Sequence, residues 1–123
     1  HLEGDHCLKK IATSLEKAVK PYQKSLFSRY GGEEFVCLLP KVDTQTAALI
    51  ASELQAKISQ LALTHEGVDK GQVTISLGCQ TLTPSNDIGR EKLIEGADRA
   101  LYMAKKCGRD QFYQWDGQNE HPK

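Results

Sequence analysis

The chain has 123 residues, which is enough for one domain with a single core but not for two. Acidic and basic residues number 16 each, and this zero formal net charge argues against a general nucleic-acid or acidic-membrane binder. No apolar run approaches the ~20 residues of a membrane span, and no secretory signal opens the chain, so we expect a soluble, cytoplasmic domain. The widely spaced cysteines lack a Cys-x-x-Cys pair, which indicates reduced thiols rather than a zinc site or a redox pair.

The first half of the chain predicts a helix, a β-hairpin and a second helix. The first helix follows Gly4 and ends at Pro21, and its apolar residues share one face: Leu8, Ile11, Leu15 and Val19. Two short apolar runs, residues 25–30 and 35–39, flank a Gly-Gly pair and predict the hairpin. Pro40 closes the second run, and Asp43 or Thr44 can cap the next helix. That helix is expected to bury Leu54, Ile58 and Leu61, with Ala47 and Ala51 on the same face.

The second half predicts a loop, a strand, a helix and a closing strand. Residues 64–71 are polar and indicate the loop, and partial alternation over residues 73–82 predicts a long strand. Residues 91–107 form the third helix, which Gly108 terminates in a left-handed conformation. Its apolar residues are Leu93, Ile94, Ala97, Leu101 and Ala104. Residues 111–115 form the closing strand, and residues 116–123 are a polar tail.

This order of elements indicates an α+β fold. Helix, strand, strand, helix, strand, helix and strand make most of a ferredoxin-like or palm-type unit. Such a unit has a mainly antiparallel sheet flanked by helices. It also begins with a strand, and that first strand is absent from this chain.

The turn of the predicted hairpin concentrates charge. It runs from Arg29 to Phe35, with Gly31 and Gly32 followed by the carboxylates of Glu33 and Glu34. Neighbouring carboxylates repel, so the two should face opposite ways or share a cation. Taken alone, such a string is also compatible with a solvated turn that carries two surface acids.

Four separated strings resemble those of the GGDEF family, the diguanylate cyclases. Residues 29–35 match the Glu variant of the Gly-Gly-Asp/Glu-Glu-Phe signature, and residues 1–5 resemble a Gly-His-x-x-Gly-Asp string. Residues 74–78 resemble a Thr-Val-Ser-Ile-Gly strand. Residues 97–110 resemble the last helix, Ala-Asp-x-Ala-Leu-Tyr-x-Ala-Lys-x-x-Gly-Arg-Asn. The resemblance identifies residues 1–115 as part of a GGDEF catalytic domain from a nucleotidyl cyclase-like palm fold.

The resemblance implies a bacterial signalling enzyme, a nucleotidyltransferase that condenses two GTP into cyclic di-GMP and two pyrophosphates in a homodimer. It implies Mg²⁺ or Mn²⁺ as the cofactor, since phosphoryl transfer needs charge neutralisation. Glu33 matches the metal-binding acid, which also helps to deprotonate the attacking 3′-hydroxyl. Gly31 and Gly32 let the substrate approach. Glu34 either holds the hairpin or contacts a second metal.

The resemblance also assigns substrate contacts at both ends of the chain. Asp5 matches the guanine-reading acid, and the alternative is that it caps the first helix. Lys105 and Arg109 are four apart at the end of a helix, so we expect them to share a face, where they could grip the β- and γ-phosphates together. The alternative is that they only offset the helix dipole.

Two departures from the family pattern lead to predictions. The family's first strand carries a second metal-binding Asp, which we expect upstream in a longer polypeptide. The other explanation is a true truncation that relies on another chain, for example through domain swapping. Residues 1–123 alone are expected to show no cyclase activity. Tyr22 and Ser25 stand where many cyclases have the Arg and Asp of a product-inhibition site, so we expect no such site.

An alternative function is a degenerate GGDEF domain that binds GTP or mediates dimerisation without catalysis. A purely structural domain with a fortuitous turn is a third possibility. We expect an upstream sensor domain in the full protein, which can itself be membrane-tethered, and neither nucleic acid nor direct membrane contact for this domain.

Overall fold

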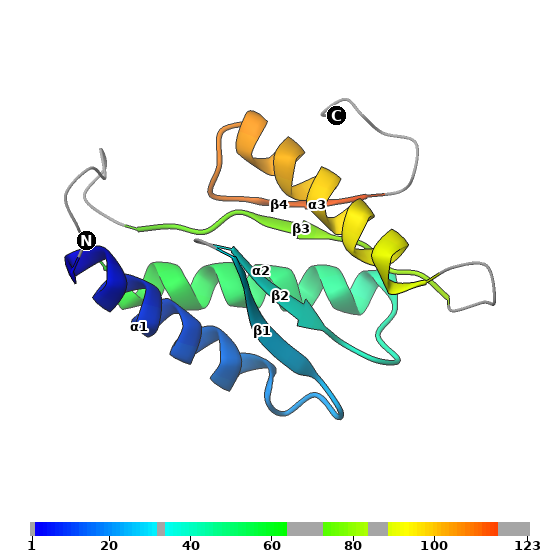
Figure 1. The fold of residues 1–123 in the computed structure, drawn as a ribbon, viewed down its shortest axis with the longest axis horizontal. Helices are drawn as coiled ribbons and strands as arrows, with labels where there is room; N and C mark the ends of the chain where they lie inside the picture. Colours follow the sequence, from blue (N-terminus) through cyan, green and yellow to red (C-terminus); the bar gives the residue numbers. More distant parts are fainter. Residues whose placement is uncertain (1, 32–33, 64–72, 84–88, 116–123) are drawn as a thin grey trace. The chain divides into compact units, whose positions relative to one another are not determined.

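The computed structural model describes residues 2–31, 34–63, 73–83 and 89–115. Their elements are α1 (Leu2–Val19), β1 (Leu26–Gly31), β2 (Glu34–Leu38), α2 (Thr44–Leu61), β3 (Leu77–Cys79), α3 (Arg90–Lys106) and β4 (Phe112–Gln114), as Figure 1 shows. The chain divides into two compact units. One contains His1–Lys41 and Ala56–Val73, and the other contains Val42–Gln55 and Thr74–Lys123.

In the first unit, α1 packs against the hairpin of β1 and β2. The strands pair antiparallel from Leu26 opposite Leu38 onwards, as the sequence predicts. Phe27 and Phe35 meet on one face of the hairpin, with ring centroids 5.4 Å apart. The buried face of α1 contains Cys7, Ile11, Leu15 and Val19. The helix begins at Leu2 and therefore includes Gly4, which the sequence placed before it.

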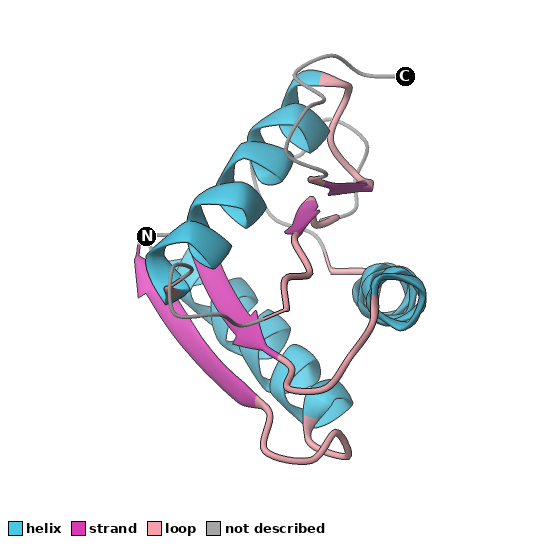
Figure 2. Cartoon of the chain, turned by 90° about the vertical axis from the view of Figure 1, so that its right-hand side faces the viewer, coloured by secondary structure: helices cyan, strands magenta, loops and turns pink. Residues whose placement is uncertain are grey.

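In the second unit, β3 and β4 form a parallel pair that α3 covers. The register places Leu77 opposite Phe112, and Figure 2 shows the two short strands side by side next to the helix. The helix buries Ala100, Met103 and Ala104. Gly78 lies directly under this helix, because a Cβ built there would overlap the backbone of Ala97 and Leu101. A glycine is therefore needed for α3 to lie this close to the strand.

Two sequence predictions were wrong, namely the long strand over residues 73–82 and the burial of Leu61. Of residues 73–82, only Leu77–Cys79 form a strand, because a strand is held by its ladder and β4 pairs only along these three residues. Leu61 is 41% exposed, since it is the last residue of α2, where the chain leaves the packed face. That face contains Ile50, Ala51, Leu54 and Ile58, of which Ile50 was not predicted. Residues 64–71, predicted as a loop, lie outside the described residues.

The predicted cap of α2 is confirmed, whereas α3 lies one residue earlier than predicted, at Arg90–Lys106 instead of residues 91–107. The Thr46 backbone N–H donates to Asp43 Oδ1 at 2.7 Å, so Asp43 is the N-cap of α2. The hydrogen bonds from Thr46 also lower the pKa of the Asp43 carboxyl. At the far end of the chain, α3 ends at Lys106, with Cys107 as its C-cap.

The fold contains four cysteines in the reduced state. All four lie in the described part of the chain, and none forms a disulfide. Burial raises the pKa of the Cys37 thiol to about 11, and it raises the pKa of Cys79 to about 11 as well. Both thiols are therefore protonated at neutral pH and act as small apolar groups in their strands.

None of the described helices has the length and apolar composition needed to cross a bilayer.

Candidate active site

The charged turn lies at the end of the hairpin, as predicted. β1 ends at Gly31 and β2 begins at Glu34, and these two residues are opposite each other in the ladder. The register shifts between Arg29 and Gly31, so the ladder is irregular next to the turn. Gly32 and Glu33 lie outside the described residues.

Open space surrounds the described glycine of this turn. A Cβ built on Gly31 meets no heavy atom within 4 Å. The neighbouring Tyr30 is exposed, and Glu34 is half-buried. The fold therefore leaves room at Gly31 for another molecule to approach the backbone.

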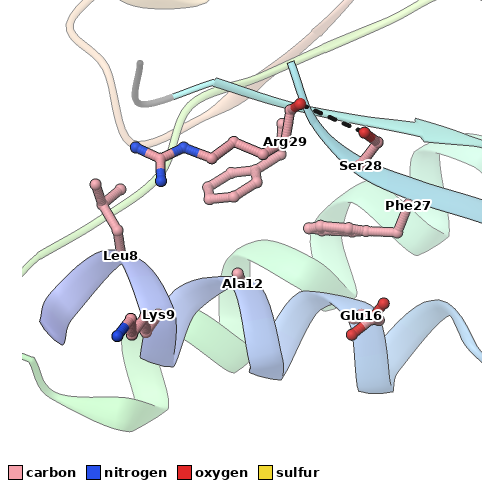
Figure 3. A pocket seen from close by; sticks show the side chains of 8 residues that line it. Leu8, Lys9, Ala12, Glu16, Phe27, Ser28 and Arg29 are labelled. Atoms are coloured by element: carbon pink, nitrogen blue, oxygen red, sulfur yellow. Dashed lines mark hydrogen bonds between the residues drawn. The ribbon is translucent and has the colours of Figure 1, made fainter. Parts of the chain in front are cut away.

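A pocket of about 380 Å³ lies between α1 and the hairpin, within the first unit. Its walls are apolar at Leu8, Ala12, Phe27 and Phe35 and polar or charged at Lys9, Glu16, Ser28 and Arg29. Figure 3 shows Phe27 above α1 and the Arg29 side chain extending towards Leu8. The pocket thus combines an aromatic surface with charged groups of both signs.

Asp5 lies within α1, about one helical turn before the first residues of this pocket. Since the helix begins at Leu2, Asp5 is not its N-cap, and that alternative was wrong. The guanine-reading role of Asp5 stays a prediction.

The two predicted phosphate ligands do not lie on one helical face. Lys105 is in the last turn of α3, whereas Arg109 follows the helix. The Gly108 N–H donates to Lys105 O at 3.4 Å, and the Arg109 N–H donates to Ala104 O at 3.0 Å. This pair of bonds is a Schellman motif, with Gly108 at φ +121° as the predicted left-handed terminator. The cap, rather than helical spacing, brings the Arg109 backbone back to the last turn of α3.

The turn after this cap is left-handed at residues other than glycine. Arg109 has φ 63° and Asp110 has φ 51°. A side chain in this region costs about 1 kcal/mol or more per residue, although Asp tolerates it better than most. Such a conformation persists when its surroundings determine it.

Tyr22 and Ser25 have structural contacts at the end of α1. Ser25 Oγ donates to Val19 O at 3.0 Å, and the Ser25 N–H donates to Tyr22 O at 3.1 Å. These bonds form the turn that leads from α1 into β1.

The donor set can be compared with the needs of Mg²⁺. In the parts of the chain that the structure describes, no three His, Cys, Asp or Glu side chains come together as a metal site. The signature supplies carboxylate oxygens, which are the donors that Mg²⁺ prefers. The carboxylates of the signature are therefore of the chemical type that binds Mg²⁺.

Comparison with known proteins identifies the fold. The family model described as "Diguanylate cyclase, GGDEF domain" matches residues 1–111. The chain belongs to the GGDEF family. The GGDEF domain of DgcB from Caulobacter crescentus, solved in complex with c-di-GMP, has a TM-score of 0.82 at 26% identity. That match covers 95% of this chain and 65% of the solved one, and it confirms the predicted palm-type α+β fold.

Several curated proteins similar to this GGDEF domain are named as diguanylate cyclases. DgcP of Pseudomonas aeruginosa is 39% identical over 112 residues, which are 91% of this chain and 16% of DgcP. The probable diguanylate cyclase DgcT of Escherichia coli is 33% identical over 111 residues, which are 89% of this chain and 24% of DgcT. The chain thus spans less than a third of the length of these relatives.

Proposed function

We propose that this GGDEF domain is the catalytic part of a diguanylate cyclase that condenses two GTP into cyclic di-GMP and two pyrophosphates. The observation that supports it best is an intact signature at a hairpin turn whose Gly31 borders open space. We further propose that two such domains meet as a homodimer in the cytoplasm, under an upstream sensor domain.

Each signature residue has a distinct task in this proposal. Glu33 holds Mg²⁺ or Mn²⁺ together with an Asp expected upstream, and Glu34 supports the hairpin or a second metal. The metal, when bound, would neutralise phosphate charge, and Glu33 also helps to deprotonate the attacking 3′-hydroxyl. Gly31 and Gly32 leave room for the nucleotide at the turn.

The remaining site residues orient the substrate. Asp5 accepts hydrogen bonds from the ring N–H and the exocyclic amine of guanine, a donor pair that adenine lacks. Lys105 and Arg109 hold the β- and γ-phosphates by charge-assisted hydrogen bonds, which also stabilise charge on the leaving pyrophosphate.

The function is tested by comparing the complete polypeptide with residues 1–123. With GTP and Mg²⁺, the complete polypeptide is expected to release cyclic di-GMP and pyrophosphate, and residues 1–123 alone none. Both are measured by chromatography of the nucleotides. GTP binding without product in the complete polypeptide would instead identify a GTP-binding or dimerisation module. Product formed by residues 1–123 would show that no upstream carboxylate is needed.

We expect no product inhibition through the site at Tyr22 and Ser25, where many cyclases have an Arg and an Asp. Tyr22 and Ser25 lack the guanidinium and the carboxylate that would bind guanine edges of the product. Initial rates of the complete polypeptide should therefore stay constant when cyclic di-GMP is added. The double variant Tyr22→Arg and Ser25→Asp is the gain-of-function control. Inhibition of the unmodified protein that disappears in Tyr22→Ala would contradict the prediction.

A further inference from the structure

The left-handed turn at Arg109 is tied to two distant segments of the second unit. Gln55 on α2 donates from Nε2 to Asp110 O at 2.7 Å and to Asp110 Oδ1 at 3.0 Å. From the other side, the Asp110 N–H donates to Ser76 Oγ at 3.2 Å, just before β3. Asp110 is therefore held through its N–H, its carbonyl and its carboxylate.

The preceding peptide is also held. Gln111 Nε2 donates to Arg109 O at 3.1 Å and to Cys107 O at 3.0 Å. Together with the bond from the Arg109 N–H to Ala104 O, both backbone polar groups of Arg109 have partners. The backbone of the turn is thus fixed, while the Arg109 side chain is exposed.

We propose that Gln55, Ser76 and Asp110 form a clamp that positions Arg109 for its phosphate contact. The clamp holds two successive residues at positive φ, a conformation that an arginine seldom adopts without support. Without the clamp, the chain after Gly108 relaxes to other backbone conformations. The Arg109 guanidinium is then no longer held in one position relative to the phosphates. This inference rests on the proposed function, because it takes Arg109 to bind the nucleotide phosphates.

The three clamp residues act through Arg109 and are positioning residues. Gln55 is the most informative to change, because its amide makes two of the three clamp bonds and alanine is well accepted in a helix. Gln114 provides a matched control. Its Nε2 donates to Thr44 O at 2.9 Å, so it also ties α2 to the C-terminal segment, but at the N-terminal end of α2.

The test is a double-mutant cycle in the complete polypeptide, read by calorimetric binding of 3′-deoxy-GTP with Mg²⁺. This analogue keeps the guanine and the triphosphate but lacks the attacking hydroxyl, so binding is measured without turnover. Arg109→Ala is expected to weaken binding about tenfold or more, since it removes charge-assisted hydrogen bonds. Gln55→Ala should weaken it roughly three- to tenfold. Gln114→Ala should leave it unchanged.

The cycle separates positioning from general support of the fold. In an Arg109→Ala background, Gln55→Ala should have no further effect on binding, because its effect passes through the guanidinium. Asp110→Asn keeps the Oδ1 acceptor and a residue that tolerates positive φ, so it should bind like the unmodified protein.

Each other outcome overturns the proposal. If Gln55→Ala weakened nucleotide binding no more than Gln114→Ala does, the clamp would not position Arg109. An undiminished effect of Gln55→Ala in the Arg109→Ala background would place its action elsewhere. If Arg109→Ala bound the nucleotide as tightly as the unmodified protein, Arg109 would not be a phosphate ligand. Failure of the cyclase function is distinguishable, because it appears as absent cyclic di-GMP while the binding cycle remains intact.

Discussion

Replacing Glu33 with Gln is expected to lower cyclic di-GMP synthesis by the complete polypeptide about 100-fold or more. The substitution keeps the size of the side chain but removes the negative charge that holds the metal, and metal stabilisation of phosphoryl transfer is worth several kcal/mol. The rate with GTP and saturating Mg²⁺ measures the loss. Titration of the rate with Mg²⁺ or Mn²⁺ should also show a weaker apparent metal affinity.

The matched control is Glu53→Gln, which removes one exposed carboxylate from α2. It changes the net charge by the same amount and should leave the rate and the metal titration unchanged. If Glu33→Gln retained the rate and metal affinity of the unmodified protein, the metal-binding role of Glu33 would be wrong.

Gly78→Ala is expected to destabilise the domain by about 3 kcal/mol, because overpacking of a closed contact forces the backbone to move. The added Cβ would overlap the backbone of Ala97 and Leu101, and neither atom set can turn aside as a flexible side chain can. The free energy of unfolding, from urea denaturation with linear extrapolation, measures the effect.

Gly31→Ala is the matched glycine substitution, since its Cβ would enter open space. We expect its free energy of unfolding to stay within about 0.5 kcal/mol of the unmodified value. Its cyclase rate should nevertheless fall, because the methyl group occupies room left for the nucleotide. Equal stability of the Gly78→Ala and unmodified proteins would show that α3 can move away from β3 at little cost.

The parts of the fold that sequence predicted well are fixed by local chemistry. The hairpin follows from two β-forming runs around a Gly-Gly pair, and the start of α2 follows from the side chain of Asp43. Gly108 as a helix terminator is likewise a one-residue signal. Such signals need no knowledge of distant contacts, so they could be found from spacing alone.

The missed features depend on contacts between distant residues. The strand around Leu77 is short because its length is set by β4, which lies more than 30 residues later in the chain. The clamp joins Gln55 to Asp110, and no sequence period links a glutamine to an aspartate 55 residues away. The helical-face interpretation of Arg109 failed because periodicity stops at the cap, where Gly108 turns the chain.

The candidate site likewise has parts that the sequence predicts and parts that depend on contacts between distant residues. Family resemblance assigned Glu33, Lys105 and Arg109, and these assignments stay predictions. What the structure added is how Arg109 is held, which required side chains from α2 and from the segment before β3.

The cap after α3 also limits which changes in chain length this domain can accept. In a continuous helix, one inserted residue rotates all following residues by about 100°. Three more inserted residues complete roughly one turn, which returns the following residues to nearly their original face. Between Lys105 and Arg109 no such restoration exists, because an insertion moves Gly108 away from the single position with φ +121°. Insertions and deletions among related sequences should therefore fall before Lys105 or after Gln111, and the interval between them should keep a constant length.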